Sequence, residues 1–186
     1  MNISVFCASS HPNDYAHTAA ARELGSNLAK GGHTLLYGGS NLGLMGEVSG
    51  AALSEGGRVV AVIPTFFSEE IINSQPVSQI VRVCSMAERK EYLIAHSDAF
   101  VALPGGIGTL DEVSEVMVYN QLGPLSNAAH RDKPVLLLNI GGFYDPLLAQ
   151  LQAMRDAGFL RTSGGRVAPT TVGELMRELK SCLELP

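Results

Sequence analysis

Two groups of side chains with catalytic potential lie on neighbouring predicted helices. Asp111, Glu112 and Glu115 occupy the first turns of one helix, and Arg89 and Lys90 occupy the helix before it. Helical spacing places Glu112 and Glu115 on roughly one face and Asp111 to one side. A carboxylate can stabilise a developing cation or activate water, and an arginine can bind a phosphate with two hydrogen bonds. The alternative is structural: the acids would stabilise the helix dipole by about 0.3–1 kcal/mol, and the cations would be solvated.

Small residues follow three predicted strands, at the positions where a doubly wound sheet binds its ligands. The segments are 8–10, 38–43 and 104–109, and the last two lead directly into predicted helices. Glycine lets the backbone approach a phosphate, and a helix N-terminus offers free N–H groups and the positive end of a dipole. Two such segments on one sheet predict a ligand that carries a phosphate group, although the glycines alone are also compatible with tight turns.

Several other motifs are excluded by the residues themselves. Gly38 and Gly43 have the spacing of a P-loop, but Leu44 and Met45 stand where lysine and serine or threonine are needed. The dinucleotide fingerprint Gly-x-Gly-x-x-Gly does not follow the predicted strands, and the five histidines lack the spacing of a metal site. We therefore expect neither a metal ion nor a cofactor.

Composition and charge limit the class of protein. The chain has 186 residues, with 13 Lys and Arg against 18 Asp and Glu, and this net charge of −5 disfavours broad nucleic-acid binding. It contains no apolar run of the roughly 18 residues that a membrane span requires, and its three cysteines form no Cys-x-x-Cys pair. We expect one domain over residues 1–186, soluble and cytoplasmic, without nucleic-acid or membrane partners. Charged residues make up only 17%, a deficit that either a subunit interface or a surface rich in serine, threonine and glycine would explain.

Apolar runs and helical periodicity alternate along the whole chain. The predicted strands cover 3–7, 33–37, 58–63, 80–84, 99–103 and 135–138. The predicted helices cover 15–30, 43–55, 86–96, 109–122, 145–157 and 172–183, and residues 65–78 form a loop or one short helix. Continuous apolar strands indicate burial on both faces. The pattern predicts an α/β, Rossmann-like, doubly wound fold, with a mostly parallel sheet of six to seven strands and helices on both faces.

Four segments in order carry a resemblance to a known family. Residues 104–112, Pro-Gly-Gly-Ile-Gly-Thr-Leu-Asp-Glu, match the signature PGGxGTxxE. Residues 37–46 are similar to YGGG…GLMG, residues 86–90 to MHxRK, and residues 130–135 to the segment before the family's next strand. Over about residues 3–160 the chain resembles the LONELY GUY family of cytokinin riboside 5′-monophosphate phosphoribohydrolases, whose members are often labelled lysine decarboxylases.

The resemblance implies hydrolysis of the N-glycosidic bond of adenosine 5′-monophosphate, with or without an N6 substituent. The products would be the free base and ribose 5-phosphate. It implies Arg89 and Glu112 as the catalytic pair, in which Arg89 positions the phosphate and ribose because an arginine cannot act as an acid at neutral pH. The substrate-binding residues that it implies are Gly38, Gly39, Glu70, Met86, Lys90, Gly105, Gly106, Ile107, Gly108, Thr109, Asp111 and Glu115. It also implies a homodimer with active sites near the interface.

The chain departs from the family pattern at several positions. Ala8 and Ser40 replace glycines, Ala87 replaces the histidine of MHxRK, and residues 123–129 lengthen a connection, which leaves the base preference open. The alternative function is a non-catalytic carrier or sensor for a phosphorylated nucleotide-like ligand, similar to molybdenum-cofactor carriers. An oxidoreductase would need the missing dinucleotide fingerprint. A pyridoxal-phosphate decarboxylase would need a Schiff-base lysine and a cofactor domain, in a chain that has only four lysines.

Overall fold

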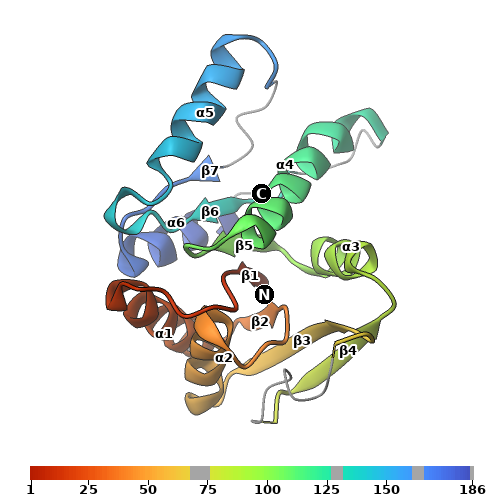
Figure 1. Cartoon of the computed structure of the whole chain (residues 1–186), viewed down its shortest axis with the longest axis vertical. Helices are drawn as coiled ribbons and strands as arrows, with labels where there is room; N and C mark the ends of the chain where they lie inside the picture. Colours follow the sequence, from red (N-terminus) through yellow and green to blue (C-terminus); the bar gives the residue numbers. More distant parts are fainter. Residues whose placement is uncertain (68–75, 127–131, 161–165, 185–186) are drawn as a thin grey trace.

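The computed structural model describes residues 1–67, 76–126, 132–160 and 166–184 (Figure 1). Glu70, one of the residues implied to bind substrate, lies outside the described residues, as does most of the predicted loop over 65–78. Within the described residues, no helix is both long enough and apolar enough to span a membrane.

Within the described residues, seven strands form a single sheet in the order β4-β3-β2-β1-β5-β6-β7, and every neighbouring pair is parallel. The strands are β1 (Asn2–Phe6), β2 (Thr34–Tyr37), β3 (Arg58–Pro64), β4 (Gln79–Val83), β5 (Ala99–Ala102), β6 (Val135–Leu137) and β7 (Arg166–Val167). From β1 the chain first builds β2, β3 and β4 to one side and then returns to build β5, β6 and β7 on the other side. The strand order therefore reverses between β1 and β5, which is where such sheets bind ligands.

Helices cover both faces of this sheet (Figure 1). They are α1 (Tyr15–Lys30), α2 (Gly43–Ser54), α3 (Met86–His96), α4 (Ile107–Ser126), α5 (Asp145–Asp156) and α6 (Val172–Glu184), with a short 3-10 turn η2 (Ile140–Gly142). Apolar residues of α1, α2 and α6 share one buried cluster with Ile3 and Val5, whereas those of α3 and α4 share another with Phe6. Because consecutive strand residues point to opposite faces, β1 contributes to both clusters. The predicted doubly wound α/β fold is thereby confirmed.

Local signals fix the start of α3, the helix that carries Arg89 and Lys90. The Ser85 side chain accepts a hydrogen bond from the Glu88 backbone N–H at 3.1 Å. The Glu88 carboxylate in turn accepts one from the Cys84 backbone N–H at 2.6 Å. This reciprocal cap satisfies backbone donors at the helix start, so the register of the residues one turn later is well determined.

Two elements differ from the sequence-based prediction. The seventh strand, β7, is only two residues long, so no apolar run marks it. Helix α4 begins at Ile107, two residues before the predicted start, so its first turn contains no acid. Asp111 and Glu112 consequently lie in the second turn, where the helix dipole has largely decayed. The structural explanation of these acids as dipole partners is weakened by this placement.

Candidate active site

Residues that follow β1, β2 and β5 meet beside the switch point and line two adjoining cavities. The first, here called the α4 cavity, has a volume of about 270 Å3 and is lined by Cys7, Ala8, Ser9, Ser10, Met45, Met86, Arg89, Gly106, Gly108, Thr109, Asp111 and Glu112. The second, here called the β3 cavity, has a volume of about 240 Å3 and is lined by Ser9, Gly38, Gly39, Ser40, Leu42, Met45, Ile63, Phe67 and Arg89. Ser9, Met45 and Arg89 line both, so the two cavities adjoin at these side chains.

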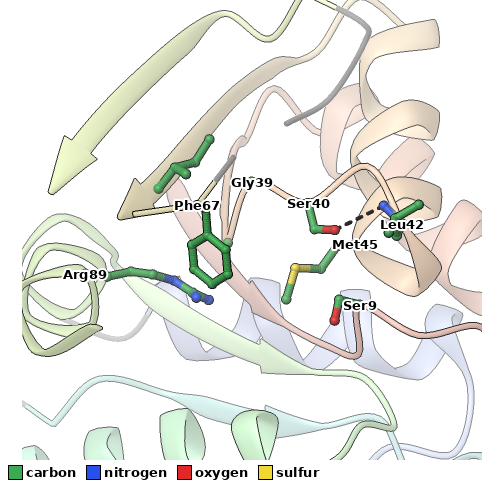
Figure 2. Close-up of a pocket in the computed structure, with 9 residues that line it drawn as sticks. Ser9, Gly39, Ser40, Leu42, Met45, Phe67 and Arg89 are labelled. Atoms are coloured by element: carbon green, nitrogen blue, oxygen red, sulfur yellow. Dashed lines mark hydrogen bonds between the residues drawn. The ribbon is translucent and has the colours of Figure 1, made fainter. Parts of the chain in front are cut away.

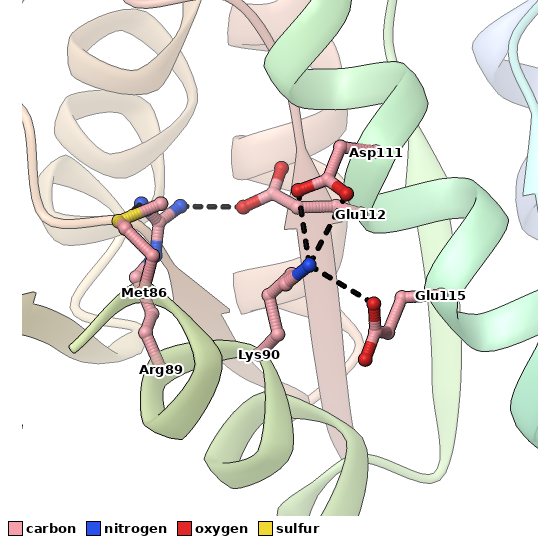
Figure 3. A network of polar contacts seen from close by, with 6 residues as sticks. All are labelled: Met86, Arg89, Lys90, Asp111, Glu112 and Glu115. Carbon is pink, nitrogen blue, oxygen red and sulfur yellow. Dashed lines mark hydrogen bonds and ion pairs between the residues drawn. The ribbon is translucent and has the colours of Figure 1, made fainter.

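A buried ion pair joins α3 to α4 at the wall of the α4 cavity. Arg89 Nη2 lies 2.5 Å from Glu112 Oε1, and the two side chains are only 7% and 5% exposed (Figure 3). Arg89 Nη1 contacts the sulfur of Met86 at 3.7 Å, while Arg89 Nε is buried without a hydrogen-bond partner among the described residues. A buried donor without a partner costs about 1–3 kcal/mol. This guanidinium is therefore set up to gain an acceptor from a ligand.

The pKa of the Glu112 carboxyl lies in a range that suits proton transfer near neutral pH. Burial raises the pKa of Glu112 to about 7, and the positive charge of Arg89 opposes that rise. The nearby charge of Asp111 also raises the pKa of Glu112, whereas that of Lys90 lowers it. A general base is most effective when its pKa lies close to the working pH.

Cys7 places a thiol in the wall of the α4 cavity. Burial is the main cause that raises the pKa of its thiol above the usual range, and Glu112 adds to the effect. The thiolate is the nucleophilic form of cysteine. Cys7 is therefore a small buried group of the cavity wall and not a nucleophile.

Lys90 forms a second set of ion pairs on the outer side of the Arg89–Glu112 pair. Its Nζ lies 3.1 Å from both carboxylate oxygens of Asp111 and 2.9 Å from Glu115 Oε2 (Figure 3). Lys90 and Glu115 line neither cavity. Glu112 and Glu115, three residues apart on α4, have different partners: Glu112 binds Arg89, whereas Glu115 shares Lys90 with Asp111. Lys90 thus ties α3 to α4 next to the reactive carboxylate.

The glycine segment before α4 is open on the side of the α4 cavity. A Cβ atom added at Gly106 or Gly108 would meet no atom within 4 Å, whereas one added at Gly105 would run into the Thr109 side chain. Thr109 itself is buried and lines the cavity. The start of α4 therefore borders the α4 cavity, and the N–H groups of a first helical turn have no partner within the helix, as an anion site at a helix N-terminus requires.

The structure brings most of the residues implied to act at the site to these two cavities. Gly38 and Gly39 line the β3 cavity, Arg89 lines both, and the α4 cavity is lined by Met86, Gly106, Gly108, Thr109, Asp111 and Glu112. The remaining described ones, Lys90, Gly105, Ile107 and Glu115, line neither. Ser9, in the predicted ligand segment 8–10, lines both cavities, whereas sequence reasoning did not assign Met45, Ile63 and Phe67 to the site. The end of a strand was the available signal for Ile63, which lies near the end of β3.

This fold and site define a class: doubly wound α/β proteins in which a helix N-terminus borders a cavity beside a buried arginine–glutamate pair. A family model described as "Possible lysine decarboxylase" matches residues 45–174. The chain belongs to this family, and its curated relatives carry a more specific name. It is 41% identical over 181 residues to "Probable cytokinin riboside 5'-monophosphate phosphoribohydrolase LOGL2" of Oryza sativa subsp. japonica, covering 96% of this chain and 71% of the relative. It is 39% identical over 180 residues to "Cytokinin riboside 5'-monophosphate phosphoribohydrolase LOG1" of Arabidopsis thaliana, and the match covers 96% of this chain and 82% of the relative.

Solved structures confirm the fold at lower sequence identity. The Moco carrier protein of Chlamydomonas reinhardtii superimposes with a TM-score of 0.72 and 24% identity, covering 98% of this chain and 96% of the other. The molybdenum cofactor binding protein of Rippkaea orientalis gives a TM-score of 0.70 and 23% identity, and the match covers 97% of this chain and 95% of the other. At this level of identity the likeness establishes the Rossmann-like architecture, and function has to be argued from the site.

Proposed function

We propose that this protein is an N-glycosyl hydrolase that acts on adenosine 5′-monophosphate, with or without an N6 substituent. The products are the free base and ribose 5-phosphate. The observation that carries this proposal is the buried Arg89–Glu112 pair beside an open glycine segment at the start of α4. The names of relatives at about 40% identity over 96% of this chain support the same reaction.

The two cavities suggest how such a nucleotide would lie. The 5′-phosphate accepts hydrogen bonds from the backbone at Gly106 and Gly108 and from the Thr109 hydroxyl, at the positive end of the α4 dipole. The ribose then lies beside Arg89 and Glu112, which share the wall of the α4 cavity. The free Nε donor of Arg89 binds a ribose or phosphate oxygen.

The chemistry follows from the charges at the ribose. The bond between C1′ and the base nitrogen breaks, its electron pair leaves with the base, and the sugar develops oxocarbenium character. Glu112 Oε1 is held by Arg89, so Oε2 stabilises this charge and takes a proton from the water that adds to C1′. The departing base takes a proton from the solvent and Glu112 returns its proton to the solvent, so one water is consumed for each base released. Arg89 stays charged throughout and fixes the carboxylate and the ligand.

The decarboxylase description of the family model is not supported by the described lysines, none of which lines either cavity. Lys90 is paired with two acids, and the hydrogen bond from Glu115 is the main cause that raises its pKa. Lys133 donates to two backbone carbonyls at the end of α3, at 2.6 and 2.8 Å. A Schiff-base lysine must lose its proton and reach a cofactor carbonyl. Neither lysine is placed for that role, and the proposed hydrolysis needs no cofactor.

The proposal includes a homodimer with its active sites near the interface, in the cytoplasm. Exposed apolar side chains lie along α4 and at the start of α3, namely Leu110, Val118, Leu122 and Met86, and Met86 also lines the α4 cavity. Such a row is typical of a surface that another subunit covers. Light scattering at micromolar concentration tests this directly: a dimer mass is expected for the parent protein, and a monomer for Leu110→Glu combined with Leu122→Glu.

The decisive assay of function measures adenine and ribose 5-phosphate released from adenosine 5′-monophosphate. The account expects both products in equal amounts. A protein that binds the nucleotide tightly but releases no base from it or from its N6-isopentenyl form would instead be the carrier or sensor that the solved relatives exemplify. Fold similarity to those carriers at 24% identity does not favour that alternative by itself.

A further inference from the structure

A buried tyrosine outside both cavities is hydrogen-bonded to the strand end that leads into the glycine segment. The hydroxyl of Tyr144, the residue before α5, donates a hydrogen bond to the backbone carbonyl of Leu103 at 2.6 Å. Both residues are buried, and neither lines the α4 cavity or the β3 cavity. The bond therefore acts on the backbone that shapes the site and not on a ligand.

Leu103 lies where the chain leaves β5 for the glycine segment. Its N–H donates to the carbonyl of Phe6 in β1 at 2.9 Å, while its own carbonyl is held by Tyr144. Only residues 104–106 separate Leu103 from the start of α4, and the first of them is a proline, whose ring fixes φ. Gly105 packs so closely that an added Cβ would collide with Thr109. A shift of the Leu103 carbonyl would therefore move the segment that borders the α4 cavity.

The turn after β6 fixes the position of Tyr144. Asn139 Oδ1 accepts a hydrogen bond from the Tyr144 backbone N–H at 2.7 Å, and Asn139 Nδ2 donates to Asp145 Oδ1 at 2.7 Å. Asn139 is itself buried. Between these residues Gly141 and Gly142 have φ values of +60° and +76°, which glycine adopts without strain. The turn therefore presents the tyrosine hydroxyl to the end of β5 in a defined orientation.

The Tyr144 hydroxyl lies near the wall of the α4 cavity and stays a hydrogen-bond donor. The tyrosine belongs to the same buried cluster as Phe6 of β1 and Val113 of α4. Burial raises the pKa of the Tyr144 hydroxyl above its usual range, and the neighbouring Cys7, which lines the α4 cavity, adds to the effect. The hydroxyl consequently keeps its proton throughout the pH range of an assay, and its bond to Leu103 does not depend on pH.

The Arg89–Glu112 pair is held by other contacts. Figure 2 shows the Arg89 side chain extending from α3 towards Ser9 and Met45, which line both cavities with it. Its guanidinium binds Glu112, which lies in the second turn of α4 next to the buried Val113. Loss of the tyrosine hydroxyl should therefore disturb the glycine segment more than it disturbs the ion pair.

We propose that Tyr144 is a positioning residue that sets the affinity of the site for the phosphate group of its ligand. It does so by holding the Leu103 carbonyl, and with it the segment 104–106, in the geometry that receives the anion. This inference rests on the proposed function, because it places the 5′-phosphate at the start of α4. Several backbone donors must point at one phosphate together. A small shift of the segment therefore weakens binding of the phosphate more than contacts with the rest of the nucleotide.

The test removes only the hydroxyl, in Tyr144→Phe, and compares ligands with and without a phosphate. The dissociation constants of adenosine 5′-monophosphate and ribose 5-phosphate are expected to rise by about tenfold, because the buried carbonyl loses its partner. The dissociation constant of adenosine should change less than about twofold. In hydrolysis, KM should rise by about tenfold while kcat stays within about threefold. Tyr15→Phe is the matched control, since it removes an exposed hydroxyl 3.4 Å from Arg22 Nη1, and it should leave all these values unchanged.

Each outcome separates the role of Tyr144 from the proposed function. Equal weakening of adenosine and its monophosphate in Tyr144→Phe, or a fall in kcat as large as the rise in KM, would show general support of the site and overturn the inference. Unchanged binding of ribose 5-phosphate would overturn it as well. If the parent releases no base, the proposed function fails, and the binding contrast still decides the role of Tyr144. Thermal unfolding verifies that the variants are folded, and Asn139→Ser, which removes the acceptor of the Tyr144 N–H, should show the same contrast.

Discussion

The guanidinium of Arg89 lies directly against the backbone of Gly38. A Cβ atom added at Gly38 would be 2.5 Å from Arg89 Nη2 and 3.2 Å from the terminal methyl of Met45. The same Nη2 atom binds Glu112. Gly38, at the end of β2, therefore leaves the space in which the arginine of α3 reaches the carboxylate of α4. Three elements far apart in the sequence set the geometry of one ion pair.

Substitution of Gly38 by alanine tests this relationship. The added methyl group would displace the guanidinium, and a misplacement of about 1 Å can reduce catalysis by about 100-fold. We expect Gly38→Ala to lower kcat by about 10- to 100-fold. Gly173→Ala in α6 is the control, because a Cβ there would meet no atom within 4 Å. Activity of Gly38→Ala within twofold of the parent would show that Arg89 does not need this space.

Two adjacent glycines before α4 should respond differently to the same substitution. A Cβ at Gly105 would collide with Thr109, whereas one at Gly106 would project into open space beside the α4 cavity. Gly105→Ala should therefore reduce the free energy of unfolding by about 1–3 kcal/mol. Gly106→Ala should unfold like the parent but raise KM, because its methyl group occupies ligand space. Thermal unfolding and steady-state kinetics of both variants measure this contrast. If KM rises in neither variant, the contrast is refuted.

The pH dependence of kcat/KM should follow the ionisation of Glu112. Because burial raises the pKa of this carboxyl to about 7 and the carboxylate is the active form, the rate should fall as the pH drops below about 7. The charge of Asp111 contributes to the raised pKa, so Asp111→Asn should move this acid limb to lower pH. Rate profiles between pH 5 and 9 measure both. A limb that stays in place in Asp111→Asn, or moves upward, would argue against Glu112 as the titrating group.

Lys90 should act as a positioning residue for Glu112. It pairs with Asp111 and Glu115 and lines neither cavity, so loss of its charge should lower kcat by about tenfold while KM stays within twofold. Since the charge of Lys90 lowers the pKa of Glu112, Lys90→Met should also move the acid limb to higher pH.

The matched control for Lys90 is Lys30→Met. Lys30 forms an exposed ion pair with Glu55 at 3.0 Å, and its substitution should leave the kinetics unchanged. A large rise in KM for Lys90→Met without a change in kcat would instead indicate that Lys90 contacts the nucleotide.

The sequence was most informative where local rules determine structure. Residues 86–96 were predicted as a helix and form one. The helix predicted over 15–30 also begins at Tyr15, after Asp14, whose side chain accepts a hydrogen bond from the Ala16 backbone N–H at 2.8 Å. The continuous apolar strands correctly indicated a parallel sheet covered on both faces. These features depend on neighbours within a few residues, which periodicity and capping chemistry describe well.

The partners of the site residues could not be predicted in the same way. Whether Ile63 and Phe67 lie near Arg89 depends on which strand ends adjoin, and the strand order is a property of the whole sheet. The pairing of Lys90 with Asp111 and Glu115 depends on how α3 and α4 pack, which helical spacing on α4 alone does not determine. The glycine signature indicated where a ligand binds, but not which side chains close the other end of the pocket.

The most direct test of the account is base release by Glu112→Gln, measured with its binding of adenosine 5′-monophosphate. Glutamine keeps the size of the side chain and an acceptor for Arg89, but it can neither take a proton nor stabilise a cation with a full charge. The account predicts that base release falls by about 100- to 10,000-fold while the nucleotide dissociation constant stays within about threefold. Glu115→Gln, on the exposed side of α4, should retain the parent rate. Base release by Glu112→Gln within tenfold of the parent would contradict the central claim that this buried carboxylate performs the chemistry.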